Sequence, residues 1–286
     1  IIAELLEHYQ SSGPDKILTD MLNQQRDITL GLRMAQTNQS PSRVYQLEKL
    51  AKKQLKNTQL WIPLKEKLLA AIQHNGKDKK KEISEMNEMA EATRNSMINA
   101  SDCLKNLDRN SENFTQVSEV AIYQIWKTIA SFEEILYEDI RRQTNTIIMT
   151  TKAKTTSHKE SLPSEQTEAY KLTGLFIERF EKSTSSPPHE QSVPDSTNQS
   201  ITTKQDVDPE TYTKIVALAM QAEASQKASI KILKAGVIND SLEKQQLSYR
   251  LLKEIEELLP KSTPQKDSKA LKQKQQQENS QKQETD

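Results

Sequence analysis

Apolar residues recur every three or four positions through most of this chain, and this spacing constrains its fold more than any other feature. Such a stripe lies on one face of an α-helix, whereas a half-buried β-strand requires strict alternation. The stripe is longest from Phe114 to Thr150, which predicts one helix of about 40 residues and about 60 Å. The whole chain contains only five glycines, which disfavours a β-rich or loop-rich fold because turns require positive φ angles. We therefore predict an all-α protein.

The composition limits how large a core these helices can share. Hydrophobic residues make up 34% of the chain and charged residues 28%. A compact globule of 286 residues would normally bury more apolar surface than this composition offers. We therefore expect an elongated array of antiparallel helical hairpins, in which each hairpin buries one stripe.

Shifts in composition divide the chain into four parts. Residues 1–182 carry the helical pattern and form the predicted hairpin array. Residues 183–207 are rich in Ser, Thr and Pro and predict a disordered linker. Residues 208–260 predict a C-terminal helical hairpin, and the Lys- and Gln-rich residues 261–286 predict a disordered tail.

Individual residues indicate where helices begin, bend and end. A first helix is expected over residues 1–9, and Pro63 is expected to bend a later one. Pro163 is expected in the first turn of another helix. Asp208 reads as an N-terminal cap, and the helix that it starts should end at Gly236.

Three segments, 15–73, 133–182 and 209–259, look like copies of one hairpin. In each copy, both helices carry a glutamine on or next to the apolar stripe. The candidate core amides are Gln25 and Gln54, Gln143 and Gln166, and Gln226 and Gln246. A fainter fourth version joins Met97, Ala100 and Leu104 to Gln116 and Ala121.

A buried glutamine is costly unless its amide finds hydrogen-bond partners. Two facing amides can satisfy each other and fix the register of two helices, as a core Asn does in coiled coils. In the first hairpin the loop centre near Gln39 is about equidistant from Gln25 and Gln54, so these two could face each other. The spacing fits the third hairpin roughly and the second poorly, because Gln166 lies close to the expected turn. The alternative is that glutamine is common here and falls on the stripes by chance.

The sequence offers no catalytic or cofactor-binding motif. Its four histidines are widely separated, and none has a second His or Cys at metal-ligand spacing. Phosphate-binding loops and nucleophile elbows are also missing. We therefore predict a non-enzymatic protein with no cofactor and no metal.

Charge and hydropathy bear on the partners of the chain. Forty basic and forty acidic residues cancel, which removes the usual electrostatic reason to propose nucleic acid as a partner. No stretch reaches the roughly 20 apolar residues of a membrane helix. The chain starts at Ile1 without Met, so an N-terminal anchor could have been lost from it. Trp61 and Trp126 are expected in helix–helix seams or, if exposed, as hot spots for a partner protein.

The stretch from Gln226 to Gly236, followed by Gln246 and Leu258-Leu259-Pro260-Lys261 with its Gln-rich tail, carries a resemblance. Together with Met97, Ala100, Leu104, Gln116 and Ala121, it resembles helical-hairpin regions of large, uncharacterised bacterial envelope proteins. These regions are akin to the helical proteins of aerotolerance (Bat) gene clusters, which also end in Gln-rich low complexity. The resemblance implies a periplasmic or membrane-associated envelope location; a cytoplasmic location stays open.

The leading hypothesis is a scaffold that mediates protein–protein interaction in a bacterial cell envelope. The alternative is a self-associating structural protein that resembles a coiled coil, suggested by the long stripe from Phe114 to Thr150. The identity of the partner proteins does not follow from the sequence.

Overall fold

The computed structural model describes residues 13–37, 42–74, 80–106, 108, 110–152, 156–185 and 208–260. All regular secondary structure in these ranges is α-helical, which confirms the predicted all-α class. The helix expected over residues 1–9 and the tail 261–286 lie outside the described residues. The first residues of the segment predicted as a linker, 183–185, belong to a helix that extends to Ser185. The rest of that segment, 186–207, also lies outside the described residues.

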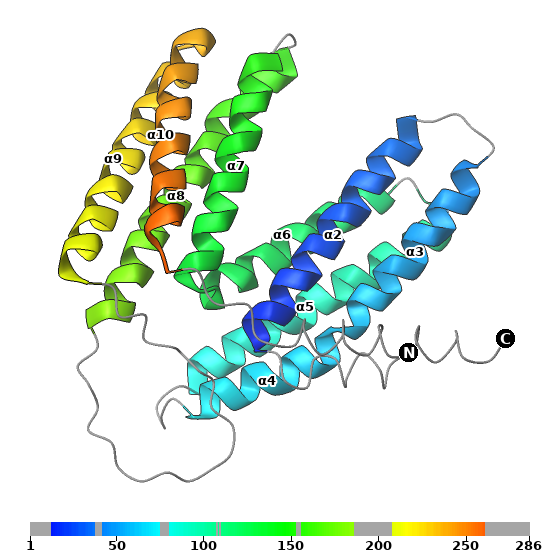
Figure 1. Ribbon diagram of the computed structural model, residues 1–286. Helices are drawn as coiled ribbons and strands as arrows, with labels where there is room; N and C mark the ends of the chain where they lie inside the picture. The colour runs from blue at the N-terminus through cyan, green and yellow to red at the C-terminus, as the bar shows by residue number, and fades with distance from the viewer. Residues whose placement is uncertain are drawn as a thin grey trace, which may run out of the picture. The chain divides into compact units, whose positions relative to one another are not determined.

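The described helices belong to two compact units, with the boundary between Ile135 and Leu136. The first unit contains α2 (Pro14–Thr37), α3 (Arg43–Gln59), α4 (Trp61–His74), α5 (Lys80–Lys105) and α6 (Ser111–Ile129). The second unit contains most of α7 (Phe132–Lys152), together with α8 (Thr156–Ser185), α9 (Pro209–Lys234) and α10 (Ile238–Leu258). Figure 1 shows these helices under the same labels.

In the first unit, α2 packs against α3 and α6, and α5 packs against the same two helices from the other side (Figure 1). The 3–4 spacing of the sequence places one apolar stripe of each helix inside this bundle. A contiguous part of the core joins α2, α3 and α5, through Ile28, Leu32, Ala35, Leu47, Leu50, Ala51 and Leu104.

The helix in which the sequence predicts a bend at Pro63 is interrupted three residues earlier, at Leu60, and this break separates α3 from α4. Helix α3 ends at Gln59, and α4 begins at Trp61 with Pro63 in its first turn. A proline has no N–H to donate, so the α-helical ladder cannot run through this position. The chain turns at Leu60, whose backbone N–H donates to the Asn57 carbonyl at 3.2 Å.

In the second unit, α9 packs against both α8 and α10 (Figure 1). Stacked aromatic rings join α8 to α9, with Phe176 5.7 Å from Phe180 and Phe180 5.4 Å from Tyr212 between centroids. Helix α9 has the ends that the sequence predicts. Asp208 caps its start by accepting from the Glu210 and Thr211 N–H groups, and Gly236 follows its last turn with φ of 78°.

The domain boundaries predicted from composition differ from those of the structure. Helices α9 and α10 pack together as the predicted C-terminal hairpin, but the hairpin is not a domain of its own, because α9 also packs on α8 and shares a unit with α7 and α8. Residues 1–182 are likewise not one array, since the boundary falls within the first turns of α7. The composition correctly marks the segment between α8 and α9 as a break in the helical pattern. It does not show that α8 and α9, on either side of that segment, pack against each other.

The prediction of a single helix of about 40 residues is wrong. The stripe from Phe114 to Thr150 is divided between α6 and α7, because Ala130 adopts an extended ψ of 140°. Ser131 and Glu134 then form a capping box. The Glu134 N–H donates to Ser131 Oγ at 3.2 Å, and the Ser131 N–H donates to Glu134 Oε2 at 3.1 Å.

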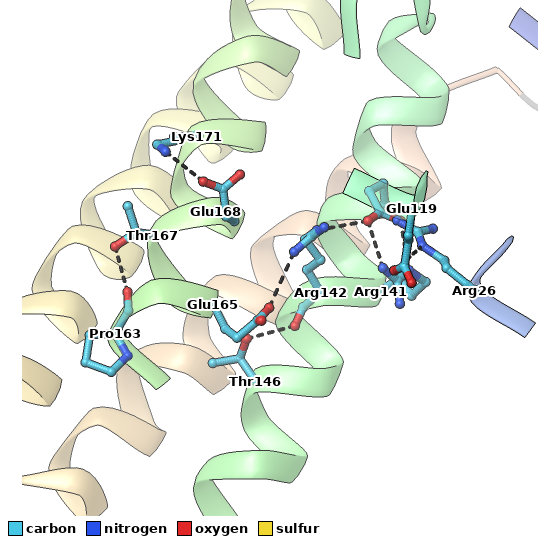
Figure 2. A network of polar contacts seen from close by, with 11 residues as sticks. Arg26, Glu119, Arg141, Arg142, Thr146, Pro163, Glu165, Thr167, Glu168 and Lys171 are labelled. Carbon is cyan, nitrogen blue, oxygen red and sulfur yellow. Dashed lines mark hydrogen bonds and ion pairs between the residues drawn. The ribbon is translucent and has the colours of Figure 1, made fainter. Parts of the chain in front are cut away.

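Helix α8 also begins earlier than predicted. It starts at Thr156 and contains Pro163 in its interior rather than in its first turn. The Pro163 carbonyl accepts a hydrogen bond from Thr167 Oγ1 at 2.6 Å (Figure 2). As a consequence, α7 and α8 are joined near residue 154, about ten residues from both Gln143 and Gln166.

None of the described helices is both long enough and apolar enough to cross a membrane.

Candidate functional site

Gln25 on α2 and Gln54 on α3 are fully buried and face each other in the first unit. Gln25 Nε2 donates to Gln54 Oε1 at 3.0 Å, and Gln54 Nε2 donates to Gln25 Oε1 at 2.9 Å. Gln25 Nε2 also lies 3.2 Å from the Thr115 carbonyl of α6. The amide pair therefore joins three helices and satisfies polar groups that would otherwise be costly to bury.

Gln143 on α7 and Gln166 on α8 form the equivalent pair in the second unit. Gln166 Nε2 donates to Gln143 Oε1 at 2.9 Å, and Gln143 Nε2 donates back to Gln166 Oε1 at 3.4 Å. Gln143 Nε2 also donates to the Gln245 carbonyl of α10 at 3.2 Å. The sequence spacing disfavours this pair only because it predicts that the second helix starts near Pro163, which puts Gln166 close to the turn. In the structure α8 starts at Thr156.

The third predicted pair does not form. Gln226 of α9 is fully buried, but Gln246 of α10 is exposed, and its neighbour Gln245 occupies the buried position instead. One residue along a helix is a rotation of about 100°, so a one-residue error moves a side chain off the core face. Gln226 joins the amides of the second unit directly, because its Nε2 lies 3.3 Å from Gln143 Oε1.

The two units share one plan beyond their glutamine pairs. The buried residues of α6 and α10 both follow a spacing of four, three, four and three residues. The residues with this spacing are Ser111, Thr115, Ser118, Ile122 and Ile125 in α6, where Tyr123 and Trp126 are buried as well, and Ser241, Gln245, Ser248, Leu252 and Ile255 in α10. The first serine of each set donates to the carbonyl three residues earlier, at 2.5 Å to Asp108 and 2.6 Å to Ile238.

The same correspondence extends to the other helices. When Gln25 is aligned with Gln143 and Gln54 with Gln166, α2 corresponds to α7, and α3 together with α4 corresponds to α8. The buried residues at 50, 54, 57, 61, 64 and 68 recur at 162, 166, 169, 173, 176 and 180. Those of α5 at 90, 93, 97, 100 and 104 recur in α9 at 219, 222, 226, 229 and 233. Segment 209–259 is therefore the counterpart of α5 and α6, and not a third copy of the first hairpin.

Three of the equivalent core positions hold larger apolar side chains in the first unit and polar ones in the second. Met21 lies four residues before Gln25, and Asp139 lies four residues before Gln143. In the same way Trp61 matches Thr173, and Met97 matches Gln226. In the first unit Trp61 Nε1 donates to Met97 Sδ at 2.8 Å, and in the second Thr173 Oγ1 donates to Gln226 Oε1 at 2.7 Å. An apolar cluster in one unit is thus a polar cluster in the other.

Asp139 lies at the centre of this polar cluster and is fully buried. Its Oδ2 lies within hydrogen-bond distance of Thr173 Oγ1, and its Oδ1 accepts from Gln226 Nε2 at 3.3 Å. Burial raises the pKa of Asp139 from 3.8 to about 8, and this outweighs the hydrogen bonds, which lower it. The periodicity of the sequence places Asp139 on the apolar stripe, but a single aspartate there matches no motif, so the sequence alone does not mark it as a candidate residue.

Charged side chains surround the edge of this cluster on α7 and α8. The nearly buried Glu138 accepts from Arg141 Nε at 2.7 Å and from Arg142 Nε at 2.9 Å. Arg142 also reaches across to Glu165 of α8, with 3.4 Å between Nη1 and Oε2 (Figure 2). Helices α7 and α8 are therefore joined by an ion pair outside the core and an amide pair inside it.

Both tryptophans lie in the core, so the alternative in which they are partner hot spots is wrong. Trp61 is 2% exposed and Trp126 is 3% exposed. Trp126 Nε1 donates to Thr19 Oγ1 at 2.9 Å, and that hydroxyl donates to Glu134 Oε1 at 2.6 Å. Their roles are to pack the first unit and, for Trp126, to join α6 to α2.

Exposed apolar side chains instead lie on the outer faces of α2 and α6 in the first unit. Two ion pairs cross between these antiparallel helices, Arg26 with Glu119 at 3.8 Å and Arg33 with Glu112 at 3.4 Å (the first appears in Figure 2). Leu30 lies between the two arginines on the same stripe of α2. We call Leu30 and Val120 the α2–α6 face; Leu30 is 54% exposed and Val120 is 58% exposed.

Among the described residues, no group of three or more His, Cys, Asp or Glu side chains could hold a metal ion. Comparison of the chain with protein-family models, curated proteins and solved structures gives no match.

Proposed function

We propose that this chain is a non-catalytic helical scaffold that binds partner proteins through exposed faces of its helices. The observation that carries the proposal is the α2–α6 face, where large apolar side chains lie at the surface of a well-packed bundle. Scattered surface apolar residues are common, but a group of them on adjacent helices is typical of interaction sites. The two Arg–Glu pairs beside this face would form the polar rim that surrounds such contacts.

A second observation supports the same proposal. Ile148 follows Gln143 by five residues, as Leu30 follows Gln25 by five, and Ile148 is also exposed. Both units therefore carry a large apolar residue at one equivalent outer position. A chain with two such positions could bind two copies of a partner, and binding at two sites raises the apparent affinity.

The finer parts of the proposal rest on the sequence. An array of antiparallel hairpins would present several helical faces side by side, which suits a scaffold better than a catalyst. The resemblance to helical regions of bacterial envelope proteins is the reason to propose the cell envelope as the location. A scaffold there would meet other envelope proteins as its partners.

In-cell cross-linking, followed by affinity capture through a C-terminal tag and mass spectrometry, tests the proposal. The variant Leu30→Glu/Val120→Glu places two charges on the α2–α6 face. Met89→Glu, at an exposed apolar residue of α5, is the matched control. We expect the wild-type chain and the control to recover the same discrete proteins and the double variant to lose them. Equal recovery by all three would contradict a partner site at this face.

Self-association is the alternative function. The break at Ala130 removes the long helix that first suggested it. The α2–α6 face could nevertheless meet the same face of a second copy. Sedimentation over a range of concentrations separates the two functions: a dimer that Leu30→Glu/Val120→Glu dissociates would favour self-association, and a monomer at every concentration would contradict it.

A further inference from the structure

The polar cluster of the second unit contains more hydrogen-bond acceptors than its protons can serve if Asp139 is ionised. Thr173 Oγ1 lies within hydrogen-bond distance of both Asp139 Oδ2 and Gln226 Oε1. A threonine hydroxyl has a single proton to donate, while both of these neighbours are acceptors. In one of these two contacts the proton must therefore come from the neighbour of Thr173, that is, from Asp139 or from Gln226.

Gln226 cannot supply that proton through its oxygen. Exchanging the two ends of its amide does not help, because Gln226 Nε2 lies 3.3 Å from Asp139 Oδ1 and 3.3 Å from Gln143 Oε1. After the exchange, the amide oxygen would face two other acceptor oxygens. The arrangement that satisfies every contact has a proton on Asp139 Oδ2. This proton is donated to Thr173 Oγ1, whose own proton is donated to Gln226 Oε1.

We propose that the core of the second unit is a proton-dependent element, in which Asp139 keeps a proton on Oδ2 while α7, α8 and α9 are packed together. Loss of the proton leaves a negative charge next to a hydroxyl and an amide that can no longer both be satisfied. The packing of α7 against α8 and α9 then loosens. The first unit has no such response, because Met21, Trp61 and Met97 occupy its equivalent positions.

The surroundings of Asp139 offer little to replace the proton. On its own helix Arg142 favours the charged form, but the larger effect of Glu138 opposes it. The buried residues of α9 and α10 are all uncharged, as are those of α8, namely Leu162, Gln166, Ala169, Leu172, Thr173, Phe176 and Phe180. Burial in these surroundings raises the pKa of Asp139 to about 8. The proton is therefore held at neutral pH and released under mildly alkaline conditions.

Hydrogen exchange of the full chain, read by mass spectrometry and expressed as protection factors, tests this element. Protection factors correct for the effect of pH on the intrinsic exchange rate. Between pH 5 and pH 8 we expect protection of α9 to fall by up to about tenfold for each pH unit, since opening releases one proton. Protection of α5 in the first unit should not follow this trend. Asp139→Asn, whose amide can donate to Thr173 in place of the acid, should abolish the trend in α9.

A trend in α9 that persists unchanged in Asp139→Asn would overturn the proposal. An infrared spectrum of the wild-type chain gives a second readout that does not depend on the variant folding. At pH 6.5 ordinary aspartates and glutamates are ionised, so a band of a neutral carboxylic acid is expected from Asp139. Absence of any such band would also overturn the proposal.

Discussion

Gln25 and Gln54 exchange two hydrogen bonds, of 3.0 and 2.9 Å, across the interior of the first unit. Gln143 and Gln166 exchange the same two bonds in the second unit. In each unit the first glutamine also donates to a backbone carbonyl at 3.2 Å, that of Thr115 on α6 or that of Gln245 on α10. This shared pattern identifies the two units as versions of one arrangement, in which α3 and α4 together correspond to the single helix α8.

Replacing Trp126 by phenylalanine should destabilise the first unit without affecting a partner. The change removes the hydrogen bond from Nε1 to Thr19 Oγ1 and part of a buried ring, so we expect a loss of about 1–3 kcal/mol. Urea unfolding followed by circular dichroism measures it. A variant of unchanged stability that fails to capture partner proteins would restore the hot-spot interpretation of this residue.

Removing the Ser131 hydroxyl should weaken the start of α7. Ser131→Ala abolishes the side-chain half of the capping box with Glu134, and N-cap substitutions of this kind cost about 1 kcal/mol. Ser131→Asp is the matched control, because it retains an acceptor for the Glu134 N–H and should keep most of the stability. Equal unfolding midpoints for the alanine and aspartate variants would contradict a capping role.

Gly236 should resist substitution although its surroundings are open. It has φ of 78°, its N–H donates to the Leu233 carbonyl at 3.0 Å, and the Val237 N–H donates to the Ile232 carbonyl at 3.2 Å. These are the bonds of a Schellman motif, which requires a left-handed residue. Because a Cβ there meets nothing within 4 Å, Gly236→Ala isolates the backbone cost, which we expect to be about 1–2 kcal/mol. Gly236→Asn should cost less; a stabilising alanine would contradict this account.

The stability of the second unit should fall as pH rises. Folding raises the pKa of Asp139 from 3.8 to about 8, so the folded unit binds a proton that the unfolded chain releases between these values. Its free energy of unfolding should drop by about 1.4 kcal/mol per pH unit in that window and level off above it. Urea titrations at several pH values measure this, and Asp139→Asn should be the more stable form at pH 8. Both tryptophans lie in the first unit, so their fluorescence serves as an internal control.

The sequence predicts the helices and most of the buried amides because both follow a 3–4 spacing that can be read from a single sequence. Five of the six predicted glutamines are buried, and Gly236 lies where it was expected to, after the last turn of α9. Gln246 was misplaced by one residue, and it therefore lies about 100° away from the buried stripe of Gln245, Ser248, Leu252 and Ile255.

Other features depend on interactions that periodicity does not encode. The break at Ala130 leaves the apolar stripe almost uninterrupted, so its only local signal is the Ser131–Glu134 capping box. The membership of α9 in the second unit depends on its packing on α8, across the segment 186–207 that separates the two helices in the sequence. Asp139 becomes significant only when Thr173 and Gln226 are brought to it from two other helices.

A double-mutant cycle on Gln25 and Gln54 tests the shared amide pair most directly. Gln25→Leu and Gln54→Leu each leave one buried amide without its partner and should each cost about 1–3 kcal/mol. The double variant removes both amides, so it should lose clearly less stability than the two single losses added together. Tryptophan fluorescence during urea unfolding gives the values for the first unit. A coupling of 1 kcal/mol or more is the predicted result, at about the size expected of contacting residues. Losses that simply add would contradict the claim that this pair joins the helices of the unit.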